Sequence, residues 1–195
     1  PKEIALSISP LSSTAIGSLP FTDPRQAVDF VLRPATDIPF WPQLPQVSFY
    51  EDMYAQASQN FPGIAIDLAA QKLLFNSTSF EQELEDFALR INHSETFTLT
   101  EEYSIVYHRF LSKELEGYKA IRGQIIGPVS FGFKVIDESL KPIIYNDDVR
   151  AILFDFIQKK VNVQYQQLRQ KNPRAFVWLD EPGLGWVFSG LSGYN

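Results

Sequence analysis

The stretch Ala-Phe-Val-Trp-Leu-Asp-Glu-Pro, residues 175–182, decides the fold class of this 195-residue chain. Its first five residues are apolar without alternation, which is typical of a parallel strand that is covered on both faces. A long helical pattern that begins at Asp147 or Asp148 precedes the stretch, and Asn172-Pro173 ends that pattern. A helix followed directly by an apolar strand predicts a β/α unit with parallel strand pairing.

Three further strands are expected upstream, over residues 12–18, from residue 38 onward and over residues 120–126. A helix is expected after the first of them, because Asp23 can cap a helix and Pro24 suits its first position. Three prolines in the second segment allow only a short strand and an extended loop. Strands that alternate with helices in this way favour a parallel sheet.

The region around residues 60–118 is expected to be a helical insertion between the second and third strands. Residues 64–76 are apolar and could form a β-hairpin or one extra strand. Ser79 and Thr98 each begin a capping-box pattern, and apolar residues at helical spacing follow both. Two helices are therefore predicted in this insertion.

Together these patterns predict a single α/β domain over residues 1–195, with about four β/α units. A closed (β/α)8 barrel needs about 250 residues, so a complete barrel does not fit into this chain. Parallel β/α units that form the first half of a (β/α)8 TIM-type barrel are the expected architecture. A small open α/β sheet is the alternative.

Composition excludes several functions. The chain has 17 basic and 23 acidic side chains, a net charge of −6, 45% hydrophobic residues and no cysteine. Disulfides, thiolate zinc ligands and a cysteine nucleophile are therefore impossible within it. The acidic balance argues against nucleic acid as a partner, since phosphate binding needs clustered Lys and Arg. No basic stretch precedes an apolar one at the start, and no apolar run is long enough for a membrane span, so a cytoplasmic protein without a membrane partner is expected.

The candidate site lies where the expected strands end, because α/β folds bind ligands beyond the carboxyl ends of their strands. Asp180 directly follows an apolar run, where its carboxylate can hold an ammonium group or accept a proton. For Glu181 a site role and a structural role are equally open. Gly17 and Ser18 could offer backbone N–H groups and a hydroxyl to an anion, or Gly17 could simply make a turn.

No metal site is expected within the chain. His93 and His108 are its two histidines, and no third ligand lies at a useful spacing from them. Sequence motifs of nucleotide-binding loops, zinc proteases and serine hydrolases are also missing.

Three segments in order, residues 14–24 (TAIGSLPFTDP), 124–131 (QIIGPVSF) and 177–184 (VWLDEPGL), resemble the cobalamin-independent methionine synthase family. They also resemble its wider superfamily, which includes uroporphyrinogen decarboxylase and corrinoid-linked methyltransferases. The likeness spans nearly the whole chain but covers only the first half of the family's catalytic barrel. It implies that Ile16, Gly17, Ser18 and Asp180 hold the amino acid that accepts the methyl group.

The resemblance also implies zinc in the full-length protein, held by His, Cys and Glu ligands in the second half of the barrel. Those ligands would lie after Asn195, and the isolated chain is expected to be inactive. Gln43 and Leu44 stand where the family has a Glu-containing loop, and Phe131 and Phe133 stand where it has a folate-stacking Trp. These departures favour a corrinoid protein over a polyglutamyl folate as the methyl donor.

Methyl transfer to a small-molecule thiol or amino acid such as homocysteine is therefore the expected function. One alternative is a decarboxylase of the uroporphyrinogen type, which would need basic residues at the rim. The other is a non-catalytic half-barrel that binds a partner or forms a homo-oligomer, because an open half-barrel exposes strand edges.

Overall fold

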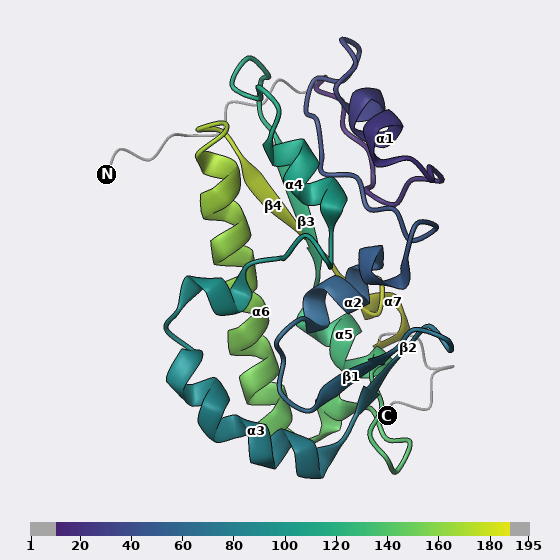
Figure 1. Ribbon diagram of the computed structural model, residues 1–195, viewed down its shortest axis with the longest axis vertical. Helices are drawn as coiled ribbons and strands as arrows, with labels where there is room; N and C mark the ends of the chain where they lie inside the picture. Colours follow the sequence, from purple (N-terminus) through teal and green to yellow (C-terminus); the bar gives the residue numbers. More distant parts are fainter. Residues whose placement is uncertain (1–10, 188–195) are drawn as a thin grey trace.

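The computed structural model describes residues 11–187, with side chains up to residue 185, and it has a mixed α/β fold (Figure 1). Short 3-10 helices lie at Phe49–Glu51 (η1), Ser94–Phe97 (η2) and Ile143–Tyr145 (η3). The helices and strands are, in chain order, α1 (Pro24–Val31), α2 (Met53–Ser58), β1 (Ile64–Asp67), β2 (Lys72–Phe75), α3 (Ser77–Arg90), α4 (Ile105–Leu111), β3 (Arg122–Ile126), α5 (Pro128–Lys134), α6 (Asp147–Arg169), β4 (Phe176–Asp180) and α7 (Leu184–Val187).

Two small sheets are present among the described residues. Strands β1 and β2 form an antiparallel pair, which confirms a hairpin as the structure of residues 64–76. Strands β3 and β4 form a parallel pair, with Arg122 opposite Phe176 and Ile126 opposite Asp180. Helix α6 connects α5 to β4 and packs along both parallel strands.

The prediction of four regular parallel strands is wrong for the first two. Residues 12–18 and the segment from residue 38 form only isolated parallel bridges, one between Ser18 and Gln43 and one between Phe40 and Arg122. The Gln43 N–H donates to Gly17 O at 2.7 Å, and Leu19 N–H donates to Gln43 O at 2.9 Å. Prolines at 39, 42 and 45 lack the N–H groups that a longer ladder would need.

The helix after the first bridged segment is confirmed, because α1 begins after Asp23, whose carboxylate accepts a hydrogen bond from Arg25 N–H at 2.8 Å. The two insertion helices exist, but both predicted starting residues are wrong. Helix α3 is capped by Asn76, and helix α4 is capped by Ser104. Asn76 and Ser104 each accept a hydrogen bond from a free N–H group in the first turn of their helix, which Ser79 and Thr98 were predicted to do.

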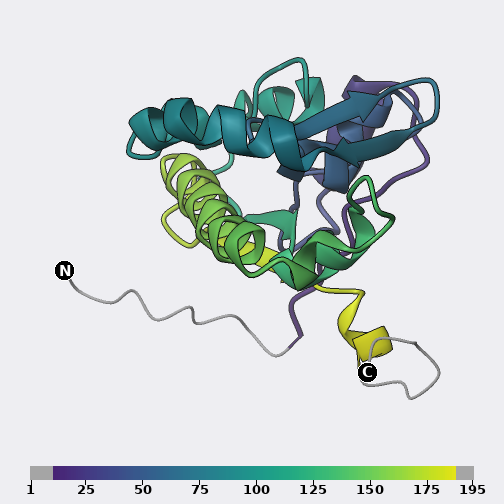
Figure 2. The same ribbon diagram turned by 90° about the horizontal axis from the view of Figure 1, so that it is seen from below.

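Figure 2 shows α3 and the β1–β2 hairpin on one side of the molecule and α6 on the other. The core between the layers has two clusters. One is rich in phenylalanine and includes Phe61, Phe131 and Phe156, and the other includes Trp41 and Phe110. Among the described residues, no helix is long and apolar enough to cross a membrane.

The parallel strands differ in burial. All five residues of β3 are buried, whereas every residue of β4 is at least partly exposed. Trp178 is 51% exposed and Leu179 is 47% exposed. The prediction that the 175–179 strand is covered on both faces is therefore wrong within the described part of the chain. No strand among residues 11–187 pairs with the second edge of β4.

Candidate functional site

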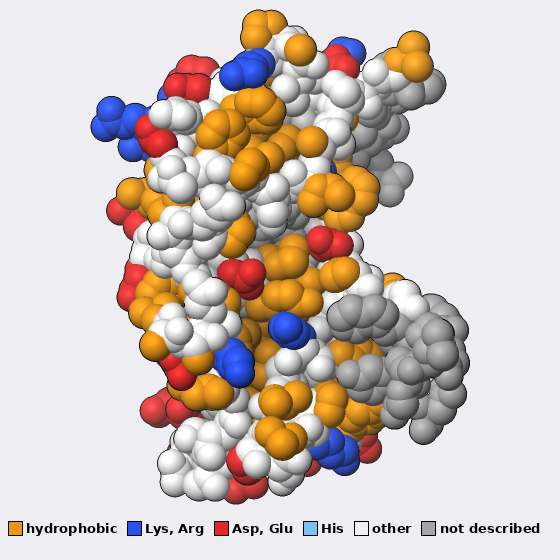
Figure 3. All heavy atoms as spheres, turned by 90° about the vertical axis from the view of Figure 1, so that its right-hand side faces the viewer, with side chains coloured by type: hydrophobic (Ala, Val, Ile, Leu, Met, Phe, Trp, Pro, Cys, Tyr) orange, Lys and Arg blue, Asp and Glu red, His pale blue; other side chains and the backbone are white. Residues whose placement is uncertain are grey.

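The carboxyl ends of the parallel strands meet at one edge of the sheet. Gly127 N–H, just past β3, donates to Asp180 O at 2.6 Å, and Asp180 is the last residue of β4. Figure 3 views the molecule from the right-hand side of Figure 1. Acidic and basic side chains lie beside hydrophobic ones on this face.

Residues alternate between the two faces of the sheet, as a pleated strand requires. Gly123 faces α6, because a Cβ at this position would collide with the Gln164 side chain. Arg122 faces the opposite side, where it contacts Trp178 of β4. Asp180 lies two residues after Trp178 and therefore shares that face of β4. The face turned away from α6 thus carries the candidate site.

Asp180 is half-buried and interacts electrostatically with two neighbouring groups. Burial lowers the pKa of the Arg122 guanidinium, and the Asp180 carboxylate opposes that shift. Burial raises the pKa of the Tyr54 hydroxyl, and the charges of Asp52, Asp180 and Glu181 raise it further. The site therefore brings a carboxylate close to one guanidinium and one phenol.

Arg122 is a site residue that the sequence reasoning missed. Its side chain is almost fully buried, and its guanidinium carbon lies 5.1 Å from the Trp178 ring centre and 5.4 Å from that of Phe40. Its Nη2 donates to Ala15 O, and its Nε has no hydrogen-bond partner among the described residues. Arg122 therefore binds the segment before Gly17 and interacts electrostatically with the Asp180 carboxylate. A cation within an otherwise uncharged strand was the sequence feature that could have revealed it.

Within residues 11–187, the Glu181 carboxylate has hydrogen-bond donors and the Asp180 carboxylate has none. Its carboxylate accepts hydrogen bonds from Val129 N–H at 3.1 Å and from Ser130 N–H at 2.7 Å, at the start of α5. A Cβ at Gly127 would collide with this carboxylate, so the glycine permits the approach. Ser130 Oγ in turn accepts from Gly183 N–H at 2.8 Å. The two adjacent carboxylates therefore have different surroundings, and Glu181 holds the turn after β4 against α5.

The 16–18 segment contacts Gln43 and Gln124 through Gly17. The Ile16 side chain is 78% exposed, and Ser18 is exposed as well. Gly17 is buried, and a Cβ there would collide with the side-chain amide of Gln124. The close approach of that amide explains why residue 17 is a glycine.

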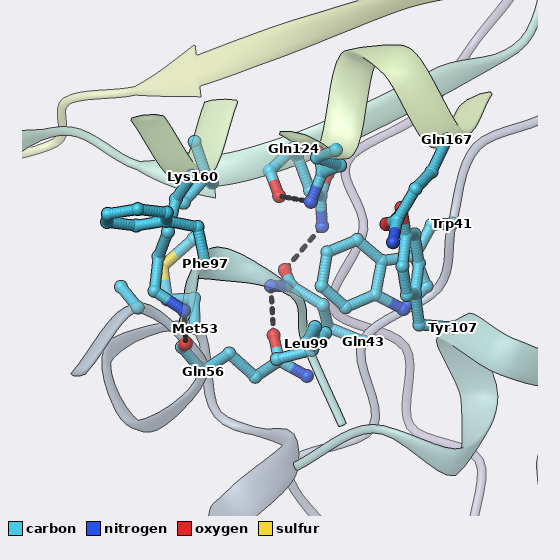
Figure 4. A pocket seen from close by; sticks show the side chains of 13 residues that line it. Trp41, Gln43, Met53, Gln56, Phe97, Leu99, Tyr107, Gln124, Lys160 and Gln167 are labelled. Atoms are coloured by element: carbon cyan, nitrogen blue, oxygen red, sulfur yellow. Dashed lines mark hydrogen bonds between the residues drawn. The ribbon is translucent and has the colours of Figure 1, made fainter. Parts of the chain in front are cut away.

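Three buried glutamines form a row of hydrogen bonds (Figure 4), and the Gln124 end of the row lies against Gly17. The Gln124 Nε2 donates to Gln43 Oε1, and Gln43 Nε2 donates to Gln56 Oε1 at 2.8 Å. Gln56 Nε2 then donates to the Glu51 carboxylate at 3.2 Å. The sequence singled out Gln43 as a departure from the family's Glu-containing loop, and it did not reveal the rest of the row, because no motif marks glutamines that are far apart in sequence.

Glu51 is buried at the end of this row. Ser104 Oγ donates to its Oε2 at 2.7 Å, and Val106 N–H donates to its Oε1 at 3.4 Å. Burial raises the pKa of the Glu51 carboxyl to about 7, while the Ser104 and backbone hydrogen bonds oppose the rise. This carboxyl group therefore changes its charge near neutral pH.

A small pocket of about 20 Å³ lies between α6 and the glutamine row, with room for about one water molecule. Lys160 of α6 lines it, and its Nζ donates to Gln56 O at 3.2 Å. Burial lowers the pKa of the Lys160 ammonium to about 7. Gln164 Oε1 and Trp41 Nε1 also belong to lining residues and have no hydrogen-bond partner within the described structure.

The described residues hold no group of three or more His, Cys, Asp or Glu side chains that could bind a metal ion. His108 Nε2 lies 2.7 Å from Leu99 O, and His93 precedes η2. His108 therefore bonds within the region of α4, and His93 lies at the start of η2.

Comparison with known proteins gives no match: no family model, no curated protein and no solved structure is significantly similar to this chain. A function must therefore be argued from its residues and their geometry.

Proposed function

We propose that this chain is the first half of a (β/α)8 barrel that binds a small amino-acid thiol at the ends of its strands. Hydrogen bonds between neighbouring segments support the barrel order. Residues 17–19 bond to Gln43, Phe40 bridges to Arg122, and β3 pairs with β4. Four segments in chain order, each parallel to the next, have the arrangement of consecutive barrel strands.

The position of Asp180 is the observation that carries the proposed binding function. It lies at the carboxyl end of β4, and no hydrogen bond to its carboxylate is found among the described residues, unlike Glu181. Its negative charge acts to raise the pKa of the Arg122 guanidinium and of the Tyr54 hydroxyl. A carboxylate beside a guanidinium suits a zwitterion, with Asp180 binding the ammonium and the backbone of residues 16–18 or Arg122 binding the carboxylate.

Methyl transfer to the thiol of this ligand is the proposed reaction, on the basis of the resemblance to the methionine synthase family. A corrinoid protein is the proposed methyl donor. Zinc would lower the pKa of the thiol, but the described residues contain no ligand set that fits it. Under this proposal its ligands would lie after Asn195.

Calorimetry with L-homocysteine tests the role of Asp180. Asp180→Asn should weaken binding about tenfold or more, because it removes a charge-assisted contact to the ammonium. Binding of 4-mercaptobutanoate, which lacks the ammonium, should not change. Asp86→Asn alters an exposed carboxylate on α3 and serves as the matched control. Equal loss for both ligands, or no loss for either, would refute the assignment.

A non-catalytic association module is the second candidate, and the exposed apolar surface of β4 favours it. Trp178 and Leu179 lie next to a strand edge that is unpaired within residues 11–187, and such an edge is suited to pairing with another chain. Light scattering distinguishes the two: a stable dimer supports the module, and a monomer that binds L-homocysteine supports the enzyme.

Decarboxylation of an acidic tetrapyrrole has weaker support. Several basic side chains would be needed to hold its carboxylates. Of the described residues, Arg122 and Lys134 are the basic ones whose charges interact with carboxyl groups near Tyr54.

The intact mass of the natural protein tests the barrel proposal separately. A mass well above 22.2 kDa would support a longer enzyme that carries the remaining strands and the metal ligands. A mass of 22.2 kDa would favour the association module instead.

A further inference from the structure

We propose that Glu51 is the positioning residue for the 16–18 segment, acting through the buried row of Gln56, Gln43 and Gln124. The inference rests on the proposed function only in that this segment belongs to the ligand site. The row itself is defined by hydrogen bonds and can be tested without any ligand.

The direction of the row follows from Glu51. An ionised carboxylate can only accept hydrogen bonds, so the Gln56 amide must turn its NH2 group toward it. The Gln56 oxygen then faces Gln43 and accepts from its NH2 group at 2.8 Å. The Gln43 oxygen in turn accepts from Gln124. The Gln56 NH2 group also donates to Tyr103 O at 3.3 Å, so the Glu51 carboxylate and this carbonyl together set the first amide, and each later amide is set by the one before it.

Glu51 itself is firmly anchored. Ser104 Oγ and Val106 N–H bind its two carboxylate oxygens from the start of α4. Glu51 and all three glutamines are at most 5% exposed. In such surroundings each hydrogen bond is strong and an unpaired amide is costly, so the row is expected to reorient as a unit.

The row reaches the ligand segment in two ways. The Gln124 amide lies against Gly17, in the space that a Cβ would fill. The Gln43 backbone binds the segment directly, with its N–H donating to Gly17 O at 2.7 Å and its oxygen accepting from Leu19 N–H at 2.9 Å. A change in the Gln124 amide would therefore act directly on Gly17, and a shift of the Gln43 backbone would move residues 17–19.

Other polar groups meet the row from each neighbouring element. Lys160 of α6 donates to Gln56 O at 3.2 Å, and Tyr103 accepts from Gln56 Nε2 through its backbone oxygen at 3.3 Å. Asp52, next to Glu51, accepts from Tyr54 N–H at 2.8 Å at the start of α2. The Tyr107 hydroxyl of α4 donates to Gln167. Of these, Lys160 is the titratable side chain that bonds to a member of the row, so the test must separate its effect.

The test is a pH titration of the glutamine side-chain NH2 resonances by NMR, from pH 5.5 to 8.5, on the ligand-free protein. The signals of Gln56, Gln43 and Gln124 should move together, with one midpoint near 7. Glu51→Gln should abolish this shared movement. Gln59, which bonds to Thr100, is the internal reference outside the row.

Two further variants separate the causes. Ser104→Ala should raise the shared midpoint, because it removes a hydrogen bond that favours the ionised carboxylate. Lys160→Met should leave the shared movement in place. If the movement survives Glu51→Gln or disappears with Lys160→Met, Glu51 does not set the row.

A separate measurement tests whether Glu51 influences ligand binding through the 16–18 segment. Glu51→Gln should weaken L-homocysteine binding and shift the Gly17 and Leu19 backbone amides, while Asp180→Asn should leave the glutamine titration unchanged. Movement confined to Gln56 would overturn the positioning role. An intact titration in a protein that binds no L-homocysteine would refute the proposed function and leave the coupling between Glu51 and the segment standing.

Discussion

Strands β3 and β4 lie side by side with the same length and direction, yet their burial is the reverse of their polarity. β3 contains Arg122 and Gln124 and is buried throughout. β4 is the more apolar strand and is exposed along its length, with Trp178 and Leu179 each about half exposed. Burial here depends on what covers a strand more than on its own residues.

The difference has a simple structural cause. β3 has β4 on one edge and the Phe40 bridge on the other, and α6 packs on one of its faces. Among the described residues, β4 is paired on one edge only. Phe176 N–H and Asp180 O bond toward β3, so the alternate residues Val177 and Leu179 direct their backbone groups away from it. Within residues 11–187, the edge of β4 that faces away from β3 therefore has no partner strand.

The largest difference in stability is expected between alanine substitutions of one aliphatic residue in β3 and one in β4. Ile126→Ala should lower the free energy of unfolding by about 3 kcal/mol, because Ile126 is fully buried in the core. Leu179→Ala should cost less than about 1 kcal/mol, since half of that side chain is already exposed. Urea denaturation of the 195-residue chain measures both. Equal losses would mean that β4 is covered as well as β3.

The second prediction concerns the pH dependence of stability from the buried charges near β3. The folded-state pKa of Glu51 is raised from 4.5 to about 7, so the folded protein binds this proton more tightly and Glu51 lowers stability as pH rises from about 4.5 to about 7. The folded-state pKa of Lys160 is lowered from 10.5 to about 7, so its contribution rises between about pH 7 and 10.5. Together the two groups favour a minimum of stability near pH 7.

Thermal unfolding across pH 4 to 10 checks this minimum. Glu51→Gln should remove the fall in stability between about pH 4.5 and pH 7 (the acidic limb of the profile). For this shift of pKa the fall amounts to about 3 kcal/mol of unfolding free energy. Lys160→Met should remove the rise in stability between about pH 7 and pH 10.5 (the basic limb). Glu85→Gln, at an exposed position on α3, is the control and should retain both limbs.

The smallest difference in stability is expected between alanine substitutions of the two carboxylates at the end of β4. Glu181→Ala should cost about 1 kcal/mol, because it leaves the Val129 and Ser130 N–H groups at the start of α5 without their acceptor. Asp180→Ala should change stability by less than about 0.5 kcal/mol. Chemical denaturation at pH 7.5 measures the difference. A larger loss for Asp180 would assign it a structural role and weaken its place in the ligand site.

Much of the fold could be predicted from local patterns. The parallel strands at residues 122–126 and 176–180, the long helix between them and the helix after Asp23 follow from apolar periodicity and caps. The first two strands were overestimated, because three prolines leave only isolated bridges. The starts of α3 and α4 were misplaced because Asn76 and Ser104 compete with the predicted caps.

The site was partly predictable for a different reason. Asp180 and Gly17 could be proposed because strand ends converge in α/β folds. The separate roles of Asp180 and Glu181 depend on where α5 begins, which no local pattern reveals. Arg122 and the row from Glu51 to Gln124 depend on contacts between residues far apart in sequence, and glutamine and glutamate carry no motif that marks such contacts.

Hydrogen exchange at Val177 and Leu179, in the protein purified from its natural source, tests most directly whether the sheet continues beyond β4. The account predicts slow exchange for both amides, comparable to that of Ile125 in β3, because a further parallel strand would bind them. Exchange as fast as that of an exposed loop would show that β4 is a true edge, and the half-barrel account would be wrong.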